Sequence, residues 1–233
     1  MWKGDLRKQQ ILETAEKMFC ANGYEKTSVQ DILDVIHLSK GSFYHHYDSK
    51  ELLLKCICDK RAQASAEQLK TQQRLKSGID GVNQVLSAMI PFNGTGLQFL
   101  TMIIPVYLLP EGQNVFRGYQ EALKQVFLPL LMDSFDSALG SHEMFSEDPE
   151  FTAGICLDMT NDLWYAVIGQ MSRSAGKEDD SLDYGKILSL LEQYRNVLEK
   201  ILTAPFGSLH LIGLEDLKRL EQEMSSVQAA KSD

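Results

Sequence analysis

The chain has 233 residues, of which 44% are hydrophobic and 24% are charged, and this composition is ordinary for a globular protein. No apolar run reaches the roughly 18 residues that a transmembrane helix needs, and the first ten residues lack the apolar centre of a signal peptide. Four cysteines in a chain of this length do not form a disulfide framework. We therefore expect a cytoplasmic protein with no membrane span.

The net charge of −9 is unevenly distributed along the chain. Residues 1–60 hold nine Lys/Arg and nine Asp/Glu, so they are neutral, and the remainder holds fourteen basic and twenty-three acidic groups. This acidity does not exclude binding to nucleic acid, because affinity depends on the local potential at the contact face. The acidic remainder would oppose non-specific docking of DNA on the wrong face.

The first predicted helix covers residues 7–22 and carries an apolar face, and Gly23 is suited to the left-handed position that ends it. A tight two-helix stretch follows at residues 27–50. Ser28 can cap its first helix, with Asp31 three residues on closing a capping box. Ser39 can cap its second helix, whose inward residues are Phe43 and Tyr47.

The second helix of this stretch presents a small, polar outward face. At about 100° per residue, Gly41, Ser42 and His45 point away from the core, Tyr44 and His46 flank them, and Lys40 lies at the N-terminal end. Such a face can enter the major groove of DNA and reach base edges and phosphates.

The run SKGSFYHHYDSKELL, preceded by ILETAEKMFCANGYEKTSVQDI, resembles the DNA-binding domain of TetR-family transcriptional regulators over residues 7–58. The resemblance implies a homodimeric, all-helical, ligand-responsive repressor or, less often, an activator. Such proteins usually carry Gly in the turn between the two helices, whereas this chain has His37. We therefore expect His37 to adopt the left-handed conformation, which His tolerates better than most non-glycine residues.

The predicted DNA-binding residues combine the outward face with the two helix starts. We expect Lys40 and Ser42 to reach base edges or nearby phosphates, and Tyr44, His46 and Lys50 to hold phosphates. Amides at the capped helix starts assist, and Gln30 could reach a base or a phosphate. The full set is Ser28, Gln30, Ser39, Lys40, Gly41, Ser42, Tyr44, His45, His46 and Lys50. The alternative for each residue is an ordinary solvated helix face.

A metal site is the competing interpretation of His45-His46 and Cys56-x-Cys58. Neighbouring and i,i+2 side chains on a helix diverge by about 100° and 200°, so neither pair can easily hold one ion. We expect Cys56 in the core and Cys58 partly exposed, and we expect no metal and no cofactor.

Further helices are predicted beyond a head of residues 1–58, in a body of residues 59–233. Asp48 can cap a connecting helix that begins at about residue 49 and joins head to body, and residues 61–76 resemble an exposed helix. Prolines divide the rest into helices at 79–90, 96–109, 114–136, 149–174 and 182–202, then a short one after 213. Pro105 predicts a kink or break near residues 101–102, and Ser181 can cap the helix at 182–202.

The body is rich in apolar and aromatic residues mixed with polar groups at Gln98, Asn114, Asn161 and Asp162. Apolar walls with few polar anchors are what a small-molecule site needs, although such stripes can equally be core. The candidate pocket residues are Phe99, Met102, Tyr107, Phe116, Tyr119, Asn161, Trp164 and Tyr165. We expect a hydrophobic or aromatic effector, neutral or cationic. The resemblance also implies a homodimer through the helices at 149–174 and 182–202.

Two other function classes compete with a ligand-responsive regulator. An enzyme is disfavoured because the sequence contains no G-x-S-x-G, P-loop, G-x-G-x-x-G or H-E-x-x-H motif, so we assign no catalytic residue. A DNA-binding regulator controlled by a protein partner is the other alternative. We expect an all-α protein that binds a pseudo-palindromic double-stranded DNA operator as a repressor and is released by its effector.

Overall fold

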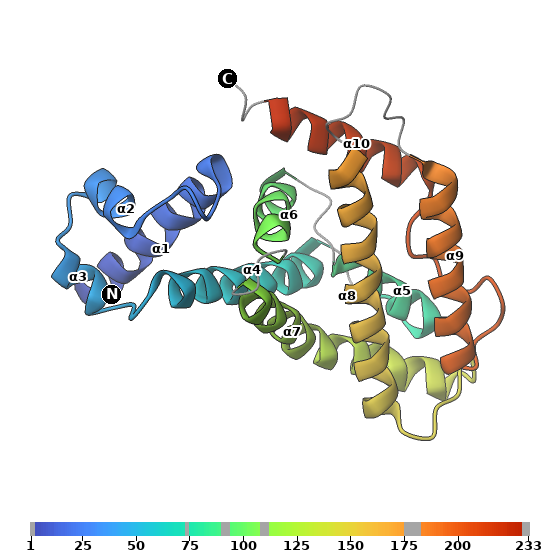
Figure 1. The fold of residues 1–233 in the computed structure, drawn as a ribbon. Helices are drawn as coiled ribbons and strands as arrows, with labels where there is room; N and C mark the ends of the chain where they lie inside the picture. The colour runs from blue at the N-terminus through green and yellow to red at the C-terminus, as the bar shows by residue number, and fades with distance from the viewer. Residues whose placement is uncertain (1–2, 73–74, 90–93, 108–111, 175–182, 230–233) are drawn as a thin grey trace.

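A computed structural model describes residues 3–72, 75–89, 94–107, 112–174 and 183–229. All regular structure within these ranges is α-helical, in ten helices (Figure 1). The all-α prediction is therefore confirmed. None of these helices combines the length and the apolar character that crossing a membrane requires.

The head consists of three helices and the first part of a fourth, which continues into the body. They are α1 (Lys3–Asn22), α2 (Val29–Ile36), α3 (Lys40–Tyr44) and α4 (Lys50–Gln72). Helix α1 packs against α2 and α4, and α2 packs against α3. Helix α4 runs from this group into the body without interruption (Figure 1), as predicted for the connecting helix that joins head to body.

Six helices form the body, and α7 is the one at its centre. They are α5 (Gly78–Ala88), α6 (Gly94–Tyr107), α7 (Gly112–Gly140), α8 (Pro149–Ser174), α9 (Tyr184–Ile201) and α10 (Leu214–Ala229). Helix α7 packs against α4, α5, α6 and α8, while α9 lies beside α8. Helix α10 crosses one end of the body and contacts α6 and α9 (Figure 1).

Helix α4 corrects three predictions. Its cap is Ser49 rather than Asp48, because Ser49 Oγ accepts from the Leu52 amide at 3.1 Å. Cys58 is fully buried and Cys56 only half-buried, the reverse of our expectation. The part beyond residue 61 is not simply exposed, because it buries Ala62, Ala66 and Leu69 against the body.

Two helix boundaries in the body also differ from prediction. Helix α6 continues through Pro105 as one element, so the predicted break near residues 101–102 is wrong, whereas the alternative of a kink stays a prediction. Helix α9 begins at Tyr184, where Asp183 Oδ1 accepts from the Lys186 amide at 3.0 Å. The predicted cap Ser181 lies outside the described residues. Asp148 caps α8 through a 3.1 Å hydrogen bond that its Oδ1 accepts from the Phe151 amide.

Candidate nucleic-acid interface and body cluster

Helix α2 is fixed at both ends by local contacts. Ser28 Oγ accepts from the Asp31 amide at 3.1 Å, and the Ser28 amide donates to Asp31 Oδ2 at 2.7 Å. These bonds lower the pKa of Asp31, with the backbone bond from Ser28 contributing most. His37 ends the helix at φ 54°, ψ 43°, and its amide donates to the Leu33 carbonyl. The capping box and the left-handed His37 are both confirmed.

Helix α3 is short, and a side chain in the turn that follows it is hydrogen-bonded to the backbone of α1. Ser39 Oγ accepts from the Ser42 amide at 3.3 Å, which caps the helix start as predicted. Phe43 and Tyr47 are buried, and the Tyr47 hydroxyl donates to the Lys8 carbonyl at 3.1 Å. Because Phe43 and Tyr47 are held in the core, the opposite side of α3 is fixed toward solvent.

The outward face of α3 is largely accessible. Tyr44 is 57% exposed, with its ring edge-on to Phe43 at 5.2 Å between centroids. The exposed members of the predicted DNA-binding set are Ser28, Gln30, Ser39, Lys40, Gly41, Tyr44 and His45. Ser42, His46 and Lys50 are half-buried. The Gln30 amide nitrogen donates to Asp34 Oδ1 at 2.6 Å, so this bond must open before Gln30 can donate elsewhere.

Lys50 lies differently from the other predicted residues. Its ammonium group is 4.0 Å from the ring centroid of Tyr24 and 5.8 Å from that of Phe19. Burial lowers the pKa of Lys50, against opposing contributions from Glu25 and other nearby acids. A phosphate contact by Lys50 remains a prediction, and it requires the side chain to leave these rings.

Two basic residues of α1, which we did not predict as part of the site, lie near the end of α3. Arg7 and Lys8 are exposed near the start of α1, and the Lys8 ammonium lies 5.8 Å from the Tyr47 ring centroid. Burial lowers the pKa of His46, and the positive charges of His45, Lys8 and Arg7 lower it further. Several basic groups therefore surround the end of α3. The sequence feature that could have indicated Arg7 and Lys8 is that two basic residues are adjacent near the start of a predicted helix.

Four candidate pocket residues meet in the body in two ring pairs. Phe99 of α6 meets Tyr119 of α7 edge-on at 5.2 Å, and Phe116 of α7 meets Tyr165 of α8 at 4.0 Å between centroids. Phe116 and Tyr119 are three residues apart on α7, so the two ring pairs lie next to each other along one face of that helix. Burial raises the pKa of Tyr165. We call Phe99, Phe116, Tyr119 and Tyr165 the aromatic cluster.

The remaining candidates lie around or outside this cluster. Met102 and Trp164 are buried, and the side chain of Tyr107 lies outside the described residues. Asn161 is 3% exposed, and its buried amide nitrogen makes no hydrogen bond to the described part of the chain. Asn161 lies one turn before Tyr165 on α8, so both share a helix face.

Three polar residues on which we based the pocket prediction are exposed rather than buried. Gln98, Asn114 and Asp162 all point to solvent, because each lies on the outer side of its helix. The prediction that these three polar side chains lie on buried faces is therefore wrong.

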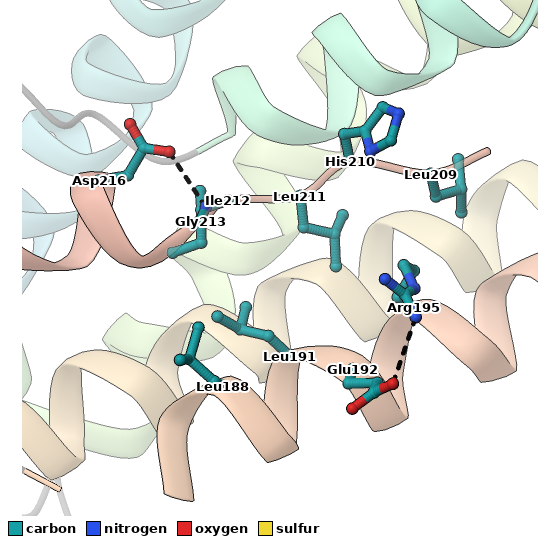
Figure 2. A pocket seen from close by; sticks show the side chains of 10 residues that line it. All are labelled: Leu188, Leu191, Glu192, Arg195, Leu209, His210, Leu211, Ile212, Gly213 and Asp216. Carbon is teal, nitrogen blue, oxygen red and sulfur yellow. Dashed lines mark hydrogen bonds and ion pairs between the residues drawn. The ribbon is translucent and has the colours of Figure 1, made fainter. Parts of the chain in front are cut away.

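A hollow of about 560 Å³ lies between α9 and the segment that leads into α10 (Figure 2). Leu188 and Leu191 contribute one wall and Leu211 and Ile212 another, with Arg195 and Asp216 at the rim. Figure 2 shows Arg195 beside Glu192 and the Asp216 carboxylate on the Gly213 amide, at 3.5 and 3.1 Å. The hollow is separate from the aromatic cluster, and the sequence of 209–213 has no periodicity that would predict it.

The described residues contain no group of three or more His, Cys, Asp or Glu side chains that could hold a metal ion. Cys58 and Cys156 are buried, and burial raises the pKa of each thiol. Since the thiolate is the nucleophile and metal ligand, neither cysteine is activated by its surroundings.

Residues 11–57 match the family model for bacterial regulatory proteins of the tetR family. The chain is 24% identical to the transcriptional regulator YerO of Bacillus subtilis over 131 residues, which are 55% of this chain and 43% of that protein. It is 34% identical to the transcriptional repressor AcnR of Corynebacterium diphtheriae over 62 residues, 27% of this chain and 33% of that protein. The chain thus spans less than half the length of either relative.

The fold is similar to a solved TetR-family transcriptional regulator from Pectobacterium atrosepticum. The TM-score is 0.57 at 16% sequence identity, and the match covers 87% of this chain and 97% of that one. Because the identity is low, this likeness concerns the fold alone. It extends the correspondence from the head to the helical body.

Proposed function

We propose that the chain is a TetR-family transcriptional regulator, as the match of residues 11–57 indicates, that it represses transcription from a pseudo-palindromic operator, and that it leaves the DNA when it binds a small molecule. Members of this family are DNA-binding regulators and not enzymes. The observation that carries the proposal is the capped helix α3, whose Phe43 is buried in the core while Lys40 and Tyr44 face solvent.

In this proposal α3 enters the major groove and the groups around it hold the two phosphate strands. Lys40 and Ser42 reach base edges or adjacent phosphates, while Tyr44 and His46 bind phosphate oxygens. Arg7 and Lys8 add positive charge where α1 meets the end of α3. These contacts are fixed in direction because the Tyr47 hydroxyl ties the end of α3 to the α1 backbone.

A homodimer through α8 and α9 would place two such heads on one face of DNA. Both helices carry exposed apolar residues, with Phe151 of α8 66% exposed and Val197 of α9 44% exposed. Recognition helices that read successive major grooves lie about 34–36 Å apart. The dimer therefore explains both these apolar side chains and the expected two-fold symmetry of the operator.

We place the effector at the aromatic cluster. Its rings supply apolar walls, the tyrosine hydroxyls supply polar groups, and Asn161 offers a buried amide donor that makes no hydrogen bond to the described residues. A buried donor without a partner is costly, and a ligand acceptor would satisfy it. A hydrophobic or aromatic molecule with one acceptor atom suits this environment.

Titration of labelled DNA tests the regulatory proposal. DNA from upstream of the gene, a duplex selected from random DNA, and scrambled DNA should be compared at two salt concentrations. If each half-site neutralises about two or three phosphates, the slope of log K against log salt should be roughly −4 to −5. Equal weak binding to all three duplexes would contradict the proposal.

Thermal unfolding with a panel of small aromatic molecules tests the effector. A ligand that binds only the folded protein raises Tm with its concentration. The same molecule must weaken operator binding, since ligand and DNA then favour different states. A molecule that raises Tm without changing DNA affinity would disqualify the aromatic cluster as an effector site.

A further inference from the structure

Glu16 is a buried charged residue on the head's first helix. It is 6% exposed and lies on the same side of α1 as the core residues Ala15 and Phe19. Its carboxylate binds the Arg61 Nε and also accepts from the Lys60 ammonium at 3.2 Å. Both partners belong to α4, where it runs into the body. A buried carboxylate is stable only while such partners remain in place.

Arg61 also contacts the aromatic cluster of the body. Its guanidinium carbon lies 5.8 Å from the ring centroid of Phe99, which is fully buried and meets Tyr119 edge-on. The positive charge of Arg61 also acts on Tyr119, where it opposes the burial that raises the pKa of that hydroxyl. One guanidinium therefore joins a carboxylate of α1 to rings of α6 and α7.

The geometry suits arginine and not lysine. A planar guanidinium can donate to a carboxylate at its edge while its face lies against an aromatic ring. Lys60 contacts the same carboxylate, but its side chain is 42% exposed, compared with 23% for Arg61. Lys60 thus stabilises Glu16 from the outside, whereas Arg61 lies between head and body.

We propose that Arg61 is a positioning residue that sets the orientation of the DNA-binding head by holding Glu16 against the Phe99–Tyr119 ring pair. This inference rests on the proposed function, since orientation matters only if the head binds DNA. It also gives the effector a route of action. A molecule that displaces either ring removes one support of Arg61, and this weakens one of the contacts that fix the head against the body. Helix α1 packs directly on α6, so the contact surface for this coupling exists.

The test compares Arg61→Met with Lys60→Met in the full chain. Both remove one cation from Glu16 and keep a long apolar side chain, so each is the control for the other. Hydrogen–deuterium exchange should rise in both α1 and α6 for Arg61→Met, although Arg61 belongs to α4. Lys60→Met should leave α6 unchanged. Circular dichroism melting verifies that both variants remain folded at the assay temperature.

Affinity for a duplex selected from random DNA by the wild-type protein is the second readout. We expect Arg61→Met to weaken binding by about ten-fold or more, within the usual range of coupling between sites, and Lys60→Met to weaken it by less than about three-fold. Glu16→Gln combined with Arg61→Met should cost less than the product of the two single effects, because both act through one contact.

Arg61→Lys covers the case in which Arg61→Met does not fold. Lysine retains a positive charge beside Glu16 but removes the guanidinium that lies 5.8 Å from the Phe99 ring centroid, so exchange should rise in α6 and less in α1. Unchanged exchange in α6 for every folded Arg61 variant would overturn the inference, whatever the DNA result. If the wild-type protein selects no DNA, the proposed function fails, while the exchange data still decide whether Arg61 joins head and body.

Discussion

Replacing Tyr44 tests the interface most directly, because two substitutions separate its ring from its hydroxyl. The side chain is 57% exposed and its ring meets Phe43 edge-on. Tyr44→Phe retains that ring contact and removes only the hydroxyl. Tyr44→Ala removes both. Neither should disturb the dimer, because Tyr44 lies on the head, far along the chain from α8 and α9.

The expected magnitude follows from one lost hydrogen bond in each half-site. A hydrogen bond to a charged phosphate is worth up to about 1.5–3 kcal/mol, and solvent access at Tyr44 places it near or below the lower limit, at about 1 kcal/mol. Two half-sites give about 2 kcal/mol, which is about a 30-fold rise in Kd. The salt slope should not change, because tyrosine carries no charge at neutral pH.

Fluorescence anisotropy with a labelled duplex at fixed salt measures both variants. Val35→Ala is the matched control, because Val35 is 59% exposed on α2 and has no polar group. If Tyr44→Phe binds as tightly as the wild type while Tyr44→Ala does not, the ring and not the hydroxyl contacts DNA. If both variants bind normally, Tyr44 is a solvated side chain and our reading of α3 is wrong.

Three further predictions concern other parts of the chain. Burial and nearby cations lower the pKa of His46 below 6.5, whereas a bound phosphate favours the protonated ring. Operator binding by the wild type should therefore tighten as pH falls from 7.5 to 6, and binding by His46→Gln should tighten less. Equal pH dependence of the two proteins would contradict a contact between His46 and phosphate. Asn161→Leu removes a buried donor without a partner, so it should stabilise the protein by about 1 kcal/mol, or about 2–4 °C in Tm, and abolish effector-induced thermal shifts. Val197→Glu should yield a folded monomer in light scattering and weak operator binding, whereas a stable dimer would exclude this face of α9 from the interface.

Much of the head could be predicted because its signals are local. Ser28 and Asp31 are three residues apart, Ser39 precedes its helix directly, and His37 stands where a turn needs a left-handed residue. Such contacts depend on only a few neighbouring residues, so the sequence nearly determines them. Where two candidate caps were adjacent, as at Asp48 and Ser49, local rules could not choose between them.

The features that the sequence did not predict correctly depend on packing between segments that are distant along the chain. Cys56 and Cys58 are both compatible with a buried helix face, and only the position of the body against α4 decides that Cys58 is inside. Glu16 and Arg61 are 45 residues apart, so no periodicity relates them. The long side chain of Lys50 could reach outward or lie over Tyr24, and the sequence does not distinguish these choices.

Residues 1–60 carry no net charge, but this sum does not describe the electrostatic potential of the surface around α3. Several acids among residues 1–60 are held in structural contacts: Asp31 binds the Ser28 amide, Glu16 binds Arg61 and Lys60, and Asp59 pairs with Lys55 at 3.1 Å. Asp31 lies at the cap of α2, and the other two lie toward α4. The basic side chains near α3 are Arg7, Lys8 and Lys40, although Asp5 also acts on His46 from the same part of α1. Since affinity for DNA follows the local potential rather than the sum of charges, a segment with equal numbers of acids and bases can still present a positive surface to the phosphates.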